Sequence, residues 1–215
     1  MRDLIKIGCV ALVLSLSLAA PVAAGPLEDA AADYERRRSA NAEALAAYNR
    51  GDYVTALRLW RPLAVQGDAS AQISLGIMYD NGSGVPQDYG EAVKWYRKAA
   101  DRGNAAAQFT LGLMYFLGQG VPQDYAEAVK WFRNAAEQGH ASAQKELGLV
   151  YDSGHGVPQD YVPAHKWLNL AAARFPASET EDRNRAVKSR DRVASKMTAA
   201  QIAEAQQLAR EWKPK

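Results

Sequence analysis

The feature that most constrains the fold of this chain is a sequence period of 36 residues. The segments 71–106 and 107–142 are each 36 residues long and are identical at 23 positions. A third copy in the same register runs from Ala143 to about residue 173, and residues 52–70 match the second half of a copy. Periods of about 20–50 residues indicate repeat architectures, in which each copy packs on its neighbours.

Each copy is predicted to form two helices, which makes the chain an all-α protein. Apolar residues recur at helical spacing in two stretches of every copy, separated by a Gly-rich segment and a Val-Pro-Gln sequence. The second stretch follows Asp88 in the first copy and Asp124 in the second. A Glu comes three residues later in both, which is the spacing of a capping box. First helices are expected over 70–80, 106–116 and 142–152.

Recurring large and small residues predict how these helices pack. Stacked hairpins would cover the tryptophans of the second helices, which one hairpin alone leaves in water: Trp95, Trp131 and Trp167. A glycine recurs inside each first helix, where it costs about 1 kcal/mol relative to alanine: Gly76, Gly112 and Gly148. Recurrence at that cost predicts close contact between helices at these positions.

The spaced residues resemble the Sel1-like repeat, a relative of the tetratricopeptide repeat. Its pattern is A-x-x-x-L-G-x-M-Y, then G-x-G-V-P-x-D, then Y-x-x-A-x-x-W-x-x-x-A-A-x-x-G. The first copy carries it as Ala71, Leu75, Gly76, Met78, Tyr79, Gly82, Gly84, Val85, Pro86, Asp88, Tyr89, Ala92, Trp95, Ala99, Ala100 and Gly103. The resemblance covers about residues 52–173. It implies a right-handed α-solenoid of helix-turn-helix repeats that acts as an adaptor in protein complexes or signalling.

Exported bacterial members of this family resemble envelope or host-interaction proteins, and some carry a disulfide in each repeat. The only cysteine of this chain is Cys9. That difference weakens any transfer of properties from the cysteine-rich branch, including its reported β-lactam binding or hydrolysis.

The regions flanking the repeats are predicted to close the stack. Residues 28–49 read as an Ala-rich helix that packs as the first helix of the leading half-repeat. After a break at 174–180, a basic helix and a last helix with an apolar stripe would cap the other end; the stripe is Ile202, Ala205, Leu208, Ala209 and Trp212. The predicted organisation is 1–24 signal peptide, 25–70 N-terminal helix and half-repeat, 71–106, 107–142 and 143–173 repeats, and 174–215 capping helices.

The first 24 residues have the composition of a secretory signal peptide. Arg2 and Lys6 precede an apolar run over 7–20, which is too short for the roughly 20 residues that a transmembrane helix needs. Small residues follow, and we expect cleavage after Ala24 and a periplasmic or secreted protein; an uncleaved anchor is the alternative. Cleavage would remove Cys9 and leave no transmembrane segment, no thiol and a net charge close to neutral.

No residue pattern indicates catalysis, a metal or a cofactor. The glycine loops lack the third glycine and the lysine of a phosphate-binding loop. The three histidines, His140, His155 and His165, do not form the i, i+4 pair of a helical zinc site. The Arg-rich stretch over 181–196 is interpreted as a solvated helix face. Anionic envelope polymers are its alternative ligand, and export argues against nucleic acid.

Positions that differ between copies are the candidates for partner binding. The second copy has Phe116-Leu117 where the first has Asp80-Asn81 and the third has Asp152-Ser153. The apolar pair is either a local adjustment of the core or a binding anchor. Because first helices usually line the concave face of this architecture, we expect a partner groove that includes Phe109, Thr110, Phe116 and Leu117.

The sequence therefore predicts a non-catalytic protein–protein interaction scaffold of the cell envelope. The protein partner cannot be identified from the residues. A peptidoglycan or glycan binding module is the first alternative, and a hydrolase of the cell wall or of β-lactams is the second.

Overall fold

The computed structural model describes residues 26–215, which form ten α-helices and no strand. The helices are α1 (Pro26–Asn49), α2 (Tyr53–Val65), α3 (Ala69–Asn81), α4 (Tyr89–Ala100), α5 (Ala105–Leu117), α6 (Tyr125–Glu137), α7 (Ala141–Ser153), α8 (Tyr161–Arg174), α9 (Thr180–Ala194) and α10 (Ala199–Glu211). The predicted signal peptide lies outside the described residues. None of the described helices is long and apolar enough to span a membrane.

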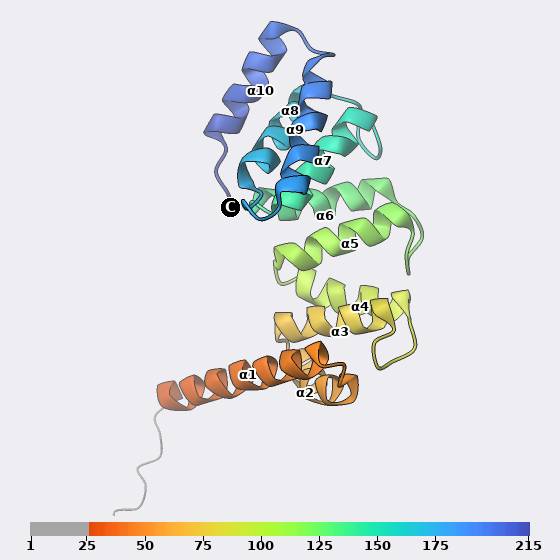
Figure 1. Cartoon of the computed structure of the whole chain (residues 1–215), viewed down its shortest axis with the longest axis vertical. Coiled ribbons are helices and arrows are strands. Elements are labelled where there is room, and N and C mark those ends of the chain that lie inside the picture. The colour runs from red at the N-terminus through yellow and green to blue at the C-terminus, as the bar shows by residue number, and fades with distance from the viewer. Residues whose placement is uncertain (1–25) are drawn as a thin grey trace, which may run out of the picture. The chain divides into compact units, whose positions relative to one another are not determined.

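The chain divides into two compact units, one ending at Arg36 and one comprising Arg37–Lys215. In the first unit the described residues are the opening turns of α1, where Arg36 pairs with Asp33 at 3.8 Å. The second unit contains the repeats. There α3 and α4, α5 and α6, and α7 and α8 form three hairpins that follow one another (Figure 1). The chain is thus an all-α solenoid of helical repeats, as predicted.

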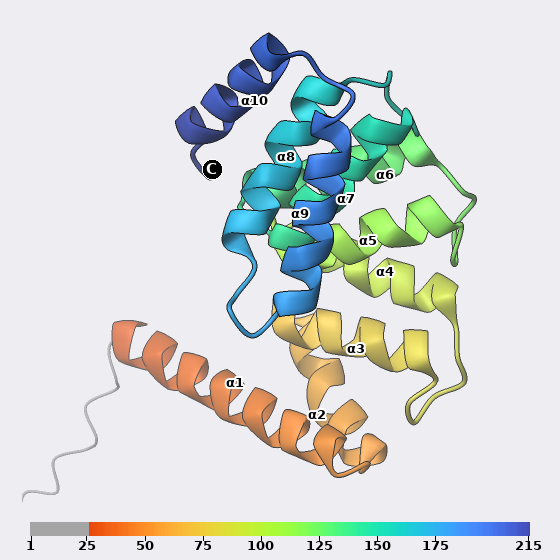
Figure 2. The ribbon, with the colours of Figure 1, turned by 45° about the horizontal axis from the view of Figure 1, so that its top comes forward.

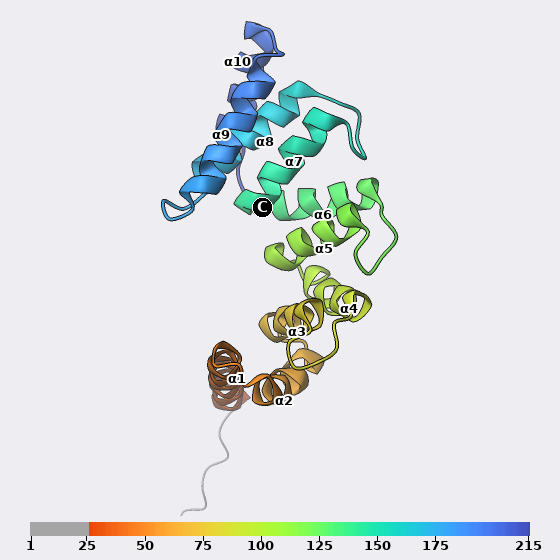
Figure 3. The ribbon, with the colours of Figure 1, turned by 45° about the vertical axis from the view of Figure 1, so that its right-hand side comes forward.

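First and second helices alternate along the stack (Figure 3). Equivalent residues occupy equivalent surroundings in successive layers. Trp95 packs on the cluster of α2 and α3 that contains Trp60 and Leu75, and Trp131 packs on the next cluster, of α4 and α5. Trp167 lies in the third cluster, of α6 and α7. The predicted aromatic seams between repeats are therefore present.

The recurring glycines allow the two helices of a hairpin to touch. A Cβ built on Gly112 would lie 2.6 Å from Cδ1 of Phe132, and one on Gly76 would lie 2.6 Å from Cε1 of Tyr96. Gly148 makes the same close approach to Leu168 at 2.7 Å. Contacts this short leave no room for a methyl group, which confirms the predicted packing role.

The predicted capping boxes are only half formed. Asp88 accepts a hydrogen bond from the backbone N–H of Glu91 at 3.0 Å, but the Glu91 carboxylate pairs with Lys94 instead of returning to the cap. The backbone N–H of Asp88 already donates to the Tyr79 carbonyl at 2.9 Å, so the capping box has no free donor. The same arrangement recurs at Asp124. A complete capping box is found at Thr198 and Gln201.

Two helices follow the third hairpin. α9 packs along α8 and also contacts α7, whereas α10 packs on α8 (Figure 2). Ala205 and Ala209 of the predicted stripe are buried, and Trp212 packs against Trp167 with ring centroids 6.1 Å apart. Leu208 is an exception to the prediction, since 39% of it is exposed. The sequence periodicity does not show that α10 packs mainly on α8.

Candidate partner-binding surface

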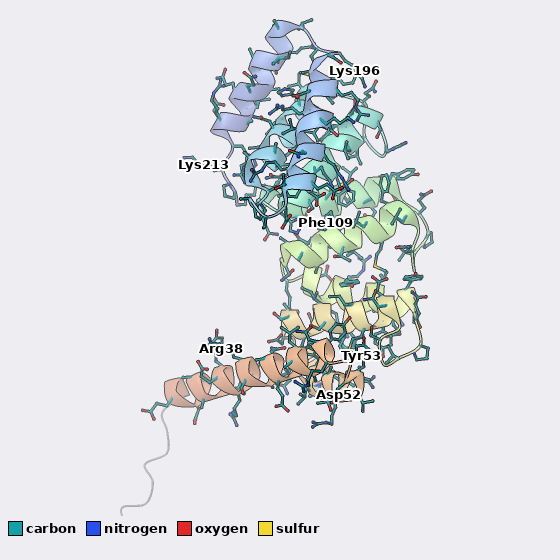
Figure 4. All side chains as sticks on the ribbon, viewed as in Figure 1. Arg38, Asp52, Tyr53, Phe109, Lys196 and Lys213 are labelled. Atoms are coloured by element: carbon teal, nitrogen blue, oxygen red, sulfur yellow. The ribbon has the colours of Figure 1, made fainter. Side chains whose placement is uncertain are left out.

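The four predicted site residues lie on α5 but have different surroundings. Phe109 (Figure 4) is half-buried. Its ring stacks on that of His140, with centroids 4.9 Å apart, and lies 6.0 Å from that of Phe132. Phe116 is also half-buried, with its ring 5.0 Å from that of Tyr125 and 6.1 Å from that of His155. Both phenylalanines therefore join α5 to residues at the two ends of α7, which agrees with a core role.

Thr110 and Leu117 lie on the neighbouring face of α5. The Thr110 hydroxyl donates to the Ala106 carbonyl of its own helix at 3.0 Å, while its side chain remains partly accessible. Leu117 is 56% exposed, which is unusual for a leucine within the repeats. The predicted set thus separates into two packing residues, Phe109 and Phe116, and two accessible ones, Thr110 and Leu117.

An apolar residue recurs at one position of each first helix, four residues before the position of Leu117. Ile77, Leu113 and Leu149 occupy the same position in α3, α5 and α7. Ile77 is 37% exposed and Leu113 is half-buried. Leu149, in contrast, packs against a cluster that contains Val193 of α9. We call Ile77, Leu113 and Leu117 the first-helix surface. Ile77 and Leu113 are the accessible members of this set of equivalent residues, and Leu117 lies one turn after Leu113 on α5.

Two acidic residues at matched positions differ in their partners. Asp152 is buried and accepts charged hydrogen bonds from Arg192 and Lys196, each at 2.8 Å. Asp80, its equivalent in α3, forms no ion pair with any described residue. Burial raises the pKa of the Asp80 carboxyl above its ordinary value. An uncompensated carboxylate thus lies at the edge of the first-helix surface, one turn from Ile77.

The basic stretch of α9 is largely occupied within the chain. Arg192 and Lys196 bind Asp152, Arg183 donates to the Phe175 carbonyl at 2.8 Å, and Arg190 contacts Asp191 and Asn169. Arg185 pairs with Glu181. The interpretation of this stretch as a solvated face is therefore incomplete, because about half of it is a docking face toward α7 and α8.

The three histidines occupy a helix cap, a buried helix position and an exposed loop. His140 caps α7, where its Nδ1 accepts a hydrogen bond from the Ala143 N–H at 3.2 Å. His165 is buried in α8, at the position of Val93 and Val129. His155 is exposed and contacts Ser153. In the described part of the chain, no three His, Cys, Asp or Glu side chains are grouped closely enough to hold a metal ion.

Sequence reasoning missed one recurring contact between repeats. An Arg of α2, α4 and α6 donates to the Tyr hydroxyl of the next first helix, at 3.4 Å for Arg61 to Tyr79 and 2.8 Å for Arg133 to Tyr151. Arg97 and Tyr115 form the equivalent pair. The regular separation of 18 residues was visible in the sequence, but only the stacked geometry shows that the two residues meet.

Stacked hairpins and recurring contacts between layers define a helical-repeat protein. A family model described as Sel1 repeat matches three consecutive segments, residues 69–104, 105–140 and 141–174. The chain belongs to the Sel1 repeat family. Proteins of this family generally mediate protein–protein interactions, and their fold is typically a non-catalytic scaffold.

Solved structures agree with this assignment. A Sel1 repeat protein from Oxalobacter formigenes is 33% identical, with a TM-score of 0.62 over 79% of this chain and 74% of that chain. A protective antigen of uropathogenic Escherichia coli strains, described as displaying an SLR fold, is 34% identical with a TM-score of 0.70 over 84% of this chain. The present chain spans only 38% of that antigen's length. No protein with a curated description matches.

Proposed function

We propose that this protein is a non-catalytic scaffold of the cell envelope that binds a protein partner through its first-helix surface. The observation that carries the proposal is the exposure of Leu117 and Ile77, on first helices whose other large apolar residues pack between layers. Exposed apolar side chains on a rigid framework are typical anchors of protein interfaces.

The framework favours binding over catalysis. Buried glutamines recur in the first helices, and their side-chain amides donate to carbonyls of the preceding helix; Gln72, Gln108 and Gln144 do so at 3.0–3.1 Å. Such contacts fix the spacing of the first helices, so the accessible side chains are held in place before a partner arrives. Preorganisation of this kind raises affinity by lowering the entropy lost on binding.

Crosslinking in the native envelope followed by mass spectrometry tests the proposal. We expect one or more proteins to crosslink through residues near Leu117, and the variant Leu117→Asp to lose most of that product. Val65→Asp is the matched control, because Val65 is 72% exposed on α2, outside the first-helix surface. Equal crosslinking by both variants would exclude the first-helix surface as the binding site.

The cellular location is a separate part of the proposal. We propose that the chain is exported and that signal peptidase cleaves it after Ala24. Amino-terminal sequencing of the protein from fractionated cells should give Gly25 as the first residue. Recovery of the intact amino terminus from the cytoplasm would refute export without affecting the binding surface.

A further inference from the structure

Among the described residues, His165 is the one histidine that is buried, and it lies where the other repeats have a valine. Val93, at the equivalent position of α4, packs in the apolar cluster that joins α4 to the next first helix, α5. Val129 packs in the same way in the cluster that joins α6 to α7. The helix that follows the third repeat and packs on α8 is α9. The histidine therefore replaces the valine only where the neighbouring helix does not belong to another repeat.

The face of α8 that carries His165 contacts a cation of α9. Asn169 lies one turn after His165 and accepts a hydrogen bond from the Arg190 guanidinium at 3.3 Å. Burial lowers the pKa of His165 below its ordinary value of 6.5, the charge of Arg190 lowers it further, and Asp191 acts in the opposite direction. His165 is only 3% exposed, and its Nδ1 has no hydrogen-bond partner among the described residues.

Positive charges already outnumber negative ones around this contact. Three cations of α9 and the turn after it meet two carboxylates; the cations are Arg190, Arg192 and Lys196, and the carboxylates are those of Asp152 and Asp191. Asp152 binds Arg192 and Lys196 at 2.8 Å each, and Asp191 pairs with Arg190 at 2.8 Å. A proton on His165 would add a fourth cation, with no free acceptor and little water to screen it.

The other titratable groups on the helices that pack around His165 have partners elsewhere or are exposed. Lys145 pairs with Asp182 and Glu146, the Tyr151 hydroxyl accepts from Arg133, Lys166 lies over the Trp167 ring, Lys196 over Tyr161 and Arg174 over Trp212, and Glu204, Arg210 and Glu211 of α10 are exposed. None of these groups offers His165 a counter-charge.

We propose that α9 is an acid-sensitive closing helix, docked on the third repeat while His165 is neutral and released when the imidazole takes up a proton. Above pH 6.5 the imidazole is neutral in both states, so docking is complete. Below that pH the released state binds the proton more readily than the docked state, and docking weakens as the pH falls. This device goes beyond the proposed function and does not depend on it.

Amide hydrogen exchange of the full chain at about pH 7.5 and about pH 5 tests the proposal. Protection factors are compared, because they remove the intrinsic pH dependence of exchange. Protection of residues 180–194 should fall by up to about thirtyfold at the lower pH, the limit reached when only the released state binds the proton with a pKa of 6.5. Protection of α3 and α4 should not change.

His165→Val separates the histidine from other effects of acid. The variant copies the other repeats, so α9 should dock and keep its protection at both pH values; His165→Gln, which is also neutral at both, serves if the valine variant does not fold. His140→Asn removes the other histidine whose pKa burial lowers and should leave the fall in α9 intact. An equal fall in the natural chain and the His165 variant, a simultaneous fall in all helices, or no fall in the natural chain would overturn the proposal.

Discussion

At the scale of single residues, equivalent positions in the half-repeat and the three repeats can be compared directly with one another. Asp52, Asp88 and Asp124 cap their helices by accepting from the third residue of the helix. In α8 that residue is Pro163, which has no N–H, and Asp160 accepts from Val162 at 3.0 Å instead. The helix thus begins in the same place although its cap has changed.

Glycine 112 provides the clearest packing prediction. Gly112→Ala should lower the free energy of unfolding by about 1–3 kcal/mol, because the new methyl group overlaps Phe132. Gly90→Ala is the control, since the second repeat has Ala126 at that position and α4 would lose a helical glycine. It should leave stability unchanged or raise it by up to about 1 kcal/mol. Urea unfolding monitored by circular dichroism measures both, and equal effects would contradict the packing role.

His140 predicts a dependence of stability on pH. Burial lowers the pKa of His140 and of His165 below the ordinary value of 6.5. At pH values between the lowered pKa of the folded chain and 6.5, the unfolded chain binds more protons than the folded chain. The free energy of unfolding is therefore highest above pH 6.5 and falls on acidification. His140→Asn, which copies Asn104 of the preceding repeat, should make this fall shallower.

The reciprocal change provides the control. Asn104→His places the same cap at the start of α5, where Asn104 accepts from the Ala107 N–H at 3.0 Å. Thermal unfolding at a series of pH values should show a steeper acid dependence for this variant than for the natural chain. Parallel profiles for the natural chain and both variants would show that the caps do not contribute to it.

At the scale of elements, α9 closes the stack through ion pairs with α7. Lys145 pairs with Asp182 at 3.3 Å near the start of α9, and Asp152 binds two cations at its end. The corresponding residues inside the stack are apolar at three of four places: Ile73, Phe109 and Phe116. The third repeat therefore has Lys145 where the other repeats have Ile73 and Phe109 because its neighbour is α9 and not another repeat.

Asp152→Asn should loosen α9 without unfolding the repeats. The expected cost is about 1–3 kcal/mol, since Asp152 is buried and binds two charged donors. Amide hydrogen exchange should accelerate in residues 180–194 and stay unchanged in α3 and α4. Glu181→Gln removes an ion pair from the exposed side of α9, where Glu181 is 80% exposed, and should leave exchange unaltered. Uniform acceleration along the chain would contradict local docking.

Sequence patterns predicted the regular part of the fold because repeat packing is local and recurs. The helices, their caps at Asp88 and Asp124 and the glycine contacts all follow from residues that return every 36 positions. The docking of α9 does not recur, so no internal comparison reveals that its cations face Asp152. Likewise, the sequence showed that Phe116 and Leu117 are unusual, but it did not show that only Phe116 is covered. Phe116 is half-buried because His155, just after the end of α7, packs against it, whereas Leu117 remains exposed.

At the scale of the whole molecule, the stack should tolerate loss of a complete repeat. Deleting residues 105–140 joins Asn104 to α7 and brings equivalent residues together, so that Arg97 meets Tyr151 in place of Tyr115. The shortened chain should fold cooperatively, with a urea m-value reduced roughly in proportion to the surface removed.

A deletion that breaks the period provides the contrast. Removing only residues 105–122 deletes α5 and leaves α6 without the first helix of its hairpin. That chain should lose near-ultraviolet circular dichroism and cooperative unfolding. Similar behaviour of the two shortened chains would show that register does not govern folding.

The ion pairs that join the last repeat to α9 also restrict how such a chain can lengthen. A duplicated repeat inserted ahead of residue 141 meets surfaces like its own and leaves both ends intact. One added after residue 174 would put the charges of Lys145 and Asp152 against an apolar neighbour and separate them from Asp182, Arg192 and Lys196. Growth of the array is therefore directional: new copies are accommodated in the interior, and the carboxyl-terminal end acts as a fixed stop.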